Sequence, residues 1–177
     1  GKTRWVRGVV ESLLNHAELQ TNRYFVEKAI DPTNKDDLKL MCTSFAIFYD
    51  ELSGIVSSKA DIQAFKNLTS SQGHLIRKAY DRNETEYLRK ASIIATVNDK
   101  QFLRDVENRR FWVIACTDIN NPNMIDLVQV WAQVKYLYQE GYKPYLNSVE
   151  LKMLKEYLRQ FEAKSTEEEL ILSYVHK

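Results

Sequence analysis

Short apolar runs bounded by polar residues alternate with longer stretches in which apolar residues recur every three or four positions. The short runs are typical of buried strands and predict strands at residues 24–26, 45–51, 92–97 and 111–116. The longer stretches are typical of helices and predict helices at residues 4–14, 35–42, 57–69, 124–140, 148–161 and 167–175. This alternation predicts an α/β fold with a parallel sheet flanked by helices.

Capping residues and composition add detail to some of these elements. Serine favours the N-cap position, and the candidate caps of the helices at 57–69 and 148–161 are Ser57, Ser58 and Ser148. Residues 70–74 predict a turn. The helix at 124–140 is apolar on nearly all sides toward its end, so we expect it to be buried, and Gly141 should end it.

Polar side chains follow two of the predicted strands. Asp50 and Glu51 end the strand at 45–51, and Asn98 follows the strand at 92–97. The acid pair resembles a Walker B element, in which one acid holds Mg²⁺ and a second orients the attacking water. The resemblance implies Asp50 for the metal and Glu51 for the water. The alternative is that the two acids only cap the next helix, because acids favour helix N-termini.

Two adjacent arginines, Arg109 and Arg110, come directly before the strand predicted at 111–116. The planar guanidinium group matches the oxygens of a phosphate. An amide and two guanidinium groups beside buried strands therefore indicate phosphoryl chemistry. The alternative is a structural ion pair with Asp105 or Glu107.

The first three residues, Gly1-Lys2-Thr3, match the end of the phosphate-binding pattern G-x-x-x-x-G-K-[ST], and a predicted helix follows them. In a complete loop the lysine reaches the β and γ oxygens and the threonine hydroxyl binds Mg²⁺. A short match can also be a cloning remnant. A chain that begins inside this motif should bind nucleotide poorly.

Basic residues are interleaved with aromatic ones between residues 74 and 89. The candidates for contact with nucleic acid, single-stranded DNA in particular, are Arg77, Lys78, Tyr80 and Arg82. The alternative is a solvated loop with ordinary surface charge. The solitary histidines, His16, His74 and His176, are assigned no role.

The bulk composition narrows the class of protein. Hydrophobic residues make up 44% and charged residues 28% of the 177 residues, which predicts one globular domain rather than a disordered or membrane protein. A formal charge of +1 argues against a broadly basic DNA-coating protein. The cysteines, Cys42 and Cys116, show no metal-ligand spacing and lie in or beside apolar runs. We expect a cytoplasmic protein without a membrane partner.

The run from Arg89 to Trp112, with its ATVN, FLRD and NRRFW segments, closely resembles the virulence-associated protein E family, P-loop ATPases of phages and mobile elements. Members usually read Thr-Gly-Asn-Arg-Arg-Phe where this chain has Val106-Glu107-Asn108-Arg109-Arg110-Phe111. The opening GKTRW resembles the end of the family's Walker A motif, and VWAQVKYLYQEGYKPYLNSVE resembles its carboxyl part. The family is similar to superfamily 3 helicases and the AAA+ group. In superfamily 3 relatives, a hairpin between Walker B and the sensor strand touches DNA.

The resemblance implies a P-loop NTPase core over residues 1–118, beginning inside Walker A and lacking its first strand, and a helical carboxyl region over residues 119–177. ATP and Mg²⁺ are the implied cofactors. The implied nucleotide-binding residues are Gly1, Lys2, Thr3 and Asp50, with Thr3 and Asp50 at the metal. The implied catalytic residues are Glu51, Asn98 as the sensor, and Arg109 or Arg110 as a finger that reaches a neighbouring copy in a homo-oligomer, a hexamer.

The implied function is ATP hydrolysis coupled to DNA unwinding or remodelling, during replication or mobilisation of a phage or genomic island. A second hypothesis stays open from the residues alone. The chain could be a non-catalytic nucleic-acid-binding or interaction module with an inherited, inactive NTPase core.

Overall fold

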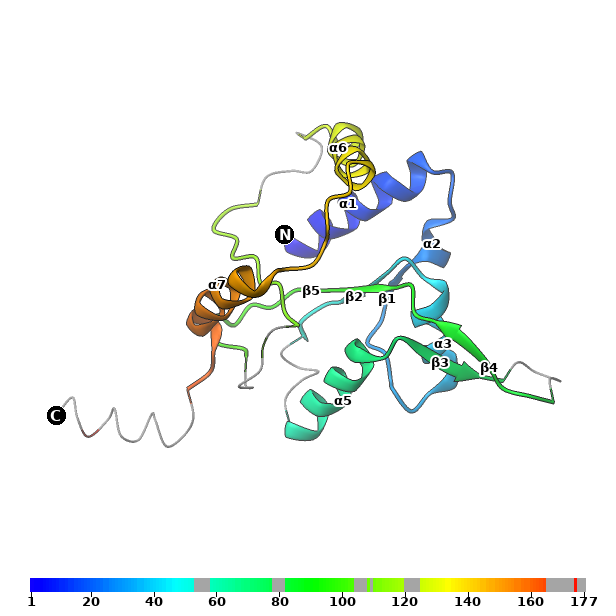
Figure 1. Cartoon of the computed structure of the whole chain (residues 1–177), viewed down its shortest axis with the longest axis horizontal. Coiled ribbons are helices and arrows are strands. Elements are labelled where there is room, and N and C mark those ends of the chain that lie inside the picture. Colours follow the sequence, from blue (N-terminus) through cyan, green and yellow to red (C-terminus); the bar gives the residue numbers. More distant parts are fainter. Residues whose placement is uncertain are drawn as a thin grey trace. The chain divides into compact units, whose positions relative to one another are not determined.

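The computed structural model describes residues 1–52, 58–77, 82–103, 108, 110–119, 125–164 and 174 (Figure 1). The chain forms two compact units. The first unit contains residues 1–96 and 116–142, and the second contains residues 97–115 and 143–177. The boundary expected between residues 118 and 119 stays a prediction.

A three-stranded parallel sheet lies at the centre of the first unit. Its order is β1 (Phe25–Glu27), β2 (Ala46–Tyr49) and β5 (Ser92–Ala95), with β2 in the middle. All four residues of β2 are buried, as expected for a parallel strand covered on both faces. Three of the predicted strands and the mixed α/β class with a parallel sheet are therefore confirmed.

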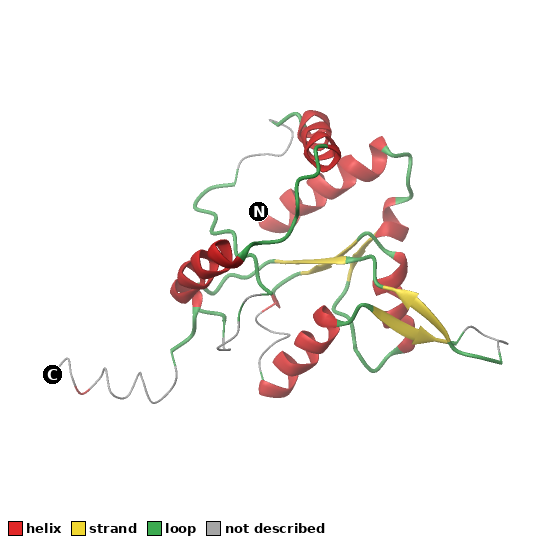
Figure 2. Ribbon diagram, viewed as in Figure 1, coloured by secondary structure: helices red, strands yellow, loops and turns green. Residues whose placement is uncertain are grey.

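Helices flank both faces of this sheet (Figure 2). Val10 and Leu14 of α1 (Lys2–His16) pack with Phe25, Ala46 and Phe48. On β2 the next side chain, Tyr49, makes an edge contact with Phe65 of α5 (Lys59–Ser70), with ring centroids 5.9 Å apart. Because neighbouring side chains of a strand point to opposite faces, α1 and α5 lie on opposite sides of the sheet.

Two shorter helices complete the connections around the sheet. They are α2 (Thr21–Tyr24), which leads directly into β1, and α3 (Lys35–Thr43), which connects β1 to β2. The Asn34 side chain caps α3 by accepting a hydrogen bond from the Asp36 N–H group. Ser58, one of the two predicted caps, forms a reciprocal capping box with Asp61 at the start of α5.

A hairpin follows α5. It consists of β3 (Gly73–Ile76) and β4 (Thr85–Leu88), which pair antiparallel in a separate sheet. The turn predicted at residues 70–74 is therefore too long, because Gly73 and His74 already belong to β3. A Cβ atom on Gly73 would lie 2.8 Å from the carbonyl oxygen of Tyr87. The close pairing of the two strands requires glycine there.

The helix predicted at residues 124–140 is present as α6 (Leu127–Gln139), and Gly141 follows it at φ 78°. Its predicted burial is wrong, because it has no buried residue. Tyr138 is 79% exposed and Tyr136 is 60% exposed. One side of α6 packs on α1. A helix that is apolar on all sides is buried only where other elements cover every side. For α6, α1 covers one side.

The second unit has its own small core. Leu103, Leu158 and Phe161 are buried at its centre, and Leu103 also exchanges main-chain hydrogen bonds with Phe161 and Ala163. Leu158 and Phe161 come from α7 (Ser148–Leu158) and the short 3₁₀ helix η2 (Arg159–Phe161).

Three predictions concern this second unit. The N-cap of α7 is Asn147, in a capping box with Glu150, and the predicted cap Ser148 is its first helical residue. The strand predicted at residues 111–116 is wrong, because these described residues form no strand. Phe111 and Val113 instead pack against the small core. The helix predicted at residues 167–175 lies outside the described residues, apart from Tyr174.

Within the described chain, every helix is too short or too polar to cross a lipid bilayer.

Candidate active site

The acid pair lies at the carboxyl end of the central strand. β2 ends at Tyr49, so Asp50 and Glu51 follow directly, and both are exposed. Tyr49 is paired with Ala95 of β5, so the next residue of that chain segment, Thr96, lies beside Asp50. The carboxyl ends of parallel strands are where open α/β sheets bind their ligands.

Asp50 joins three segments that are far apart in the sequence. The Thr3 hydroxyl donates a hydrogen bond to Asp50 Oδ1 at 3.1 Å, and the Thr96 hydroxyl donates to the same oxygen at 2.8 Å. The structure thus brings together Thr3 and Asp50, the two residues predicted at the metal. Thr96, which the sequence pattern did not single out, is the third member of this group.

Packing of α1 on the sheet accounts for the position of Thr3. Val10 and Leu14 fix the second half of α1 over β1 and β2, and the first turn of the helix lies at the carboxyl edge, where Thr3 meets Asp50. The N-terminus of a helix carries partial positive charge and unpaired N–H groups, which favour a bound anion. Gly1 is exposed and Lys2 is half-buried in this first turn.

Thr3 and Asp50 fit a magnesium ion. Mg²⁺ takes oxygen ligands, keeps several waters and commonly binds one or two carboxylates together with substrate phosphates. The hydroxyl and the carboxylate are already in contact. The part of the chain that the structure describes contains no group of three or more His, Cys, Asp or Glu side chains that could hold a metal.

Glu51 has a backbone conformation that few residues other than glycine adopt. Its φ is 58°, in the left-handed region. Its N–H group donates to the Thr96 hydroxyl at 3.3 Å, and the next N–H group, of Leu52, donates to the Thr96 carbonyl at 2.9 Å. Strained backbone of this kind is common at functional sites, where the surrounding structure holds it in place.

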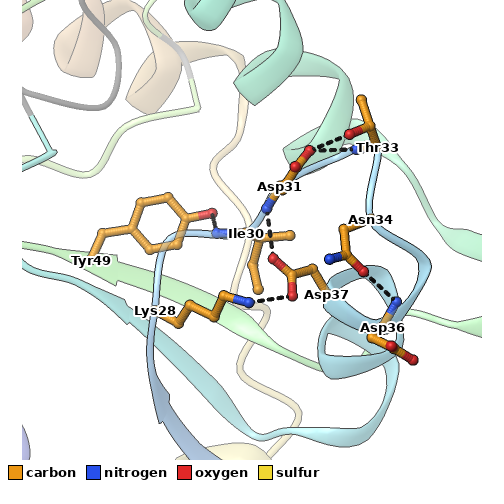
Figure 3. A network of polar contacts seen from close by, with 8 residues as sticks. All are labelled: Lys28, Ile30, Asp31, Thr33, Asn34, Asp36, Asp37 and Tyr49. Carbon is orange, nitrogen blue, oxygen red and sulfur yellow. Dashed lines mark hydrogen bonds and ion pairs between the residues drawn. The ribbon is translucent and has the colours of Figure 1, made fainter.

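The loop after β1 contacts the end of β2, the strand that precedes the two acids (Figure 3). The buried Tyr49 hydroxyl accepts a hydrogen bond from the Ile30 N–H group at 3.0 Å. Burial raises the pKa of Tyr49, so the hydroxyl stays protonated near neutral pH. The loop after β1 is thereby hydrogen-bonded to Tyr49, the residue immediately before Asp50.

A buried carboxylate, Asp37, anchors the same loop to α3. Its Oδ1 accepts from Lys28 Nζ at 2.5 Å and its Oδ2 accepts from the Asp31 N–H group at 3.0 Å, as Figure 3 shows. Burial acts to raise the pKa of Asp37, but the hydrogen bonds from Lys28 and Asp31 outweigh it and the pKa is lowered. Asp37 is therefore a charged structural anchor.

Three further site predictions concern the second unit. Asn98 is exposed and Arg110 is half-buried, and both belong to that unit. Arg109 lies outside the described residues. The sensor role of Asn98 and the finger role of the arginines stay predictions.

Of the four predicted nucleic-acid residues, the structure describes Arg77 and Arg82. Arg77 directly follows β3, and both Arg77 and Arg82 are exposed. Lys78 and Tyr80 lie outside the described residues. The hairpin also exposes two large apolar side chains, Leu75 at 61% and Leu88 at 66%.

The sequence signal for Thr96 is limited to its place near Asn98. It stands two residues before Asn98 within the ATVN segment, and its hydroxyl is the one polar side-chain group between Ile93 and Val97. The apolar strand pattern concealed it, because a buried threonine is compatible with an ordinary strand.

Comparison with known proteins identifies the family. The family model of the virulence-associated protein E-like domain matches residues 13–163. No curated protein sequence matches the chain. The matched range contains Asp50, Glu51 and Thr96, whereas Thr3 precedes it. Since the match spans most of the 177 residues, the chain belongs to the virulence-associated protein E-like domain family.

Proposed function

We propose that this protein is a Mg²⁺-dependent ATPase that couples hydrolysis to unwinding or remodelling of DNA. The observation that carries the proposal is the contact between Thr3 and Asp50 at the carboxyl edge of the sheet. A hydroxyl at a helix start and a carboxylate at the end of a buried strand are the two protein groups that hold Mg²⁺ in P-loop enzymes.

Each residue of this edge has a role in the proposed reaction. Lys2 draws charge from the β- and γ-phosphates, and Thr3 and Asp50 bind the metal. Bound Mg²⁺ neutralises charge that develops on the phosphate oxygens. Glu51 orients the attacking water and accepts its proton. This last role suits an exposed carboxylate next to the metal-binding acid.

The remaining predicted residues extend the proposal to the assembly and to DNA. Asn98 positions the water near the γ-phosphate, and Arg109 or Arg110 reaches the nucleotide of a neighbouring copy in a hexamer. The exposed Arg77 and Arg82 on the β3–β4 hairpin contact the phosphates of single-stranded DNA, together with Lys78 and Tyr80.

ATP turnover by protein that carries the complete phosphate-binding loop tests the proposal. We expect Mg²⁺-dependent hydrolysis that single-stranded DNA stimulates, and a loss of at least about 10²-fold in Glu51→Gln, because a positioned general base contributes about 10²–10⁴. The matched control is Glu18→Gln, since Glu18 is also an exposed glutamate at positive φ, 54°, but in the turn after α1.

The same assay separates the ATPase from the alternative. A protein that binds single-stranded DNA but shows no ATP turnover with the complete loop would be a binding module with an inactive core. Equal turnover in wild type, Glu51→Gln and Glu18→Gln would contradict the assignment of Glu51.

A further inference from the structure

Thr96 contacts four consecutive residues at the end of β2. Its N–H group donates to the Tyr49 carbonyl at 3.0 Å, and its carbonyl accepts from the Leu52 N–H group at 2.9 Å. Between these main-chain bonds, its hydroxyl donates to Asp50 Oδ1 at 2.8 Å and accepts from the Glu51 N–H group at 3.3 Å. One hydroxyl thus connects the two acids.

The chemistry of threonine suits this double contact. A hydroxyl supplies one donor and two acceptor sites, so it can serve a carboxylate and an N–H group at once. The branch at Cβ restricts χ1, which keeps the hydroxyl in one direction. Thr96 is only 9% exposed, so water competes little for these bonds. Valine has the same shape and could make neither of them.

The backbone of Glu51 needs such a partner. At φ 58° it has a conformation that is uncommon for residues other than glycine. The bonds from the Glu51 and Leu52 N–H groups to Thr96 lie on either side of the Glu51 Cα atom. Leu52 is also buried, so the chain is held on both sides of the strained residue.

We infer that Thr96 is the positioning residue of the acid pair: its hydroxyl orients the Asp50 carboxylate toward Mg²⁺ and holds the Glu51 backbone so that the Glu51 carboxylate meets the attacking water. Its effect on catalysis rests on the ATPase activity proposed above. Its hold on the two acids is a property of the protein without nucleotide and can be measured separately.

Amide hydrogen exchange, measured by NMR on the protein without nucleotide, tests whether the Thr96 hydroxyl holds the Glu51 backbone. In Thr96→Val we expect exchange of the Glu51 amide to accelerate about tenfold, because loss of a hydrogen bond to a hydroxyl opens that amide to water. The Leu52 amide should be unchanged, since it bonds to the main-chain carbonyl that valine retains. Thr96→Ser should restore slow exchange at Glu51.

Two results would overturn the inference. One is a Glu51 amide that exchanges at the same rate in wild type and Thr96→Val. The other is equal acceleration of Glu51 and Leu52, which would show a general opening of the strand end rather than loss of the hydroxyl contact.

Steady-state ATP hydrolysis tests the catalytic consequence. Thr96→Val should lower kcat about tenfold and raise the half-saturating Mg²⁺ concentration, and Thr96→Ser should stay within about twofold of wild type. A merely structural role would lower the active fraction without moving the Mg²⁺ dependence. The control is Thr69→Val, which removes a part-buried hydroxyl that bonds carbonyls of its own helix.

The two experiments fail in distinguishable ways. Unchanged Mg²⁺ dependence in Thr96→Val would contradict the positioning role in an active enzyme. Absence of ATP turnover in the wild-type protein would contradict the proposed function, and the exchange of the Glu51 amide would still decide whether Thr96 holds the acid pair.

Discussion

Thr3, Asp50, Glu51 and Thr96 form the acid edge of the first unit. This edge and the segment at residues 97–115 of the second unit differ in what determines their conformation. At the acid edge, strand pairing places Thr96 beside Asp50, and side-chain hydrogen bonds join Thr3, Asp50 and Thr96. The second segment contains Asn98 and Arg110. Its described residues form no helix or strand, and their one β-bridge is at Leu103.

This difference separates two kinds of site residue. Those at the acid edge are positioned by the fold of one unit. In the second segment, Phe102 and Phe111 pack on the small core, and their rings meet edge to face at 6.4 Å. In the function proposed above, the acid edge acts within one copy, and Arg109 or Arg110 acts on a neighbouring copy.

The largest effect should come from the acid edge itself. Asp50→Asn keeps the shape of the side chain and removes its charge, so Mg²⁺-dependent turnover should fall by about 10³-fold, because the metal supplies several kcal/mol of charge stabilisation. Steady-state hydrolysis measures this, with the exposed Asp118→Asn as the control. Turnover of Asp50→Asn within twofold of wild type would place the metal elsewhere.

The second effect concerns the arginine of the other segment. Arg110→Ala should lower turnover by about 10³-fold, as expected for an arginine that acts on the nucleotide of a neighbour. Mixing it with Glu51→Gln should restore part of the activity, because some interfaces then combine an intact arginine with an intact acid pair. Titration of one variant into the other measures this, and no recovery at any ratio would contradict action between copies.

Asp37 tests the support of the acid edge rather than its chemistry. Asp37→Asn should lower the free energy of unfolding at pH 7 by about 1–3 kcal/mol, the cost of breaking charged hydrogen bonds in a buried site. The folded-state pKa of Asp37 lies below its ordinary value, so its contribution is present above pH 4 and is lost as the pH falls through the folded-state pKa.

Urea unfolding of wild type and Asp37→Asn at neutral pH and near pH 3 measures both parts of this prediction. The neighbouring exposed Asp36→Asn is the matched control. A stability difference of the same size at both pH values would show that Asp37 acts through packing rather than charge.

The smallest effect should come from the β3–β4 hairpin. Burial, and then the charge of Arg89, lower the pKa of His74. The unfolded chain thus binds a proton more readily than the folded one, and the stability that the neutral imidazole contributes is lost as the pH falls below about 6.5. His74→Gln should remove part of the fall in the urea midpoint between pH 7.5 and 5.5.

The sequence predicts the acid edge well because its signals are local. An apolar run predicts β2, and two carboxylates after it predict a ligand edge. The contact between Thr3 and Asp50 followed from the resemblance to a family and could not follow from either segment alone, because it depends on how α1 packs.

Other features depend on tertiary contacts that composition does not contain. The apolar residues of α6 predict burial, but one side of the helix packs on α1 and Tyr138 stays exposed. The apolar run at residues 111–116 predicts a strand, yet its Phe111 joins a small core instead. Thr96 was missed because its hydroxyl gains its role only from the strand beside it.

A double-mutant cycle on metal–nucleotide binding tests the central claim, that Thr3 and Asp50 hold one Mg²⁺ together. The measurement is the affinity for Mn²⁺–ATP, followed by electron paramagnetic resonance, of wild type, Thr3→Val, Asp50→Asn and the double variant, all with the complete phosphate-binding loop. We expect each single variant to lose at least about tenfold and the double variant to lose little more, because residues that share one ligand are coupled. Losses that add fully, or single variants that bind as wild type does, would contradict it.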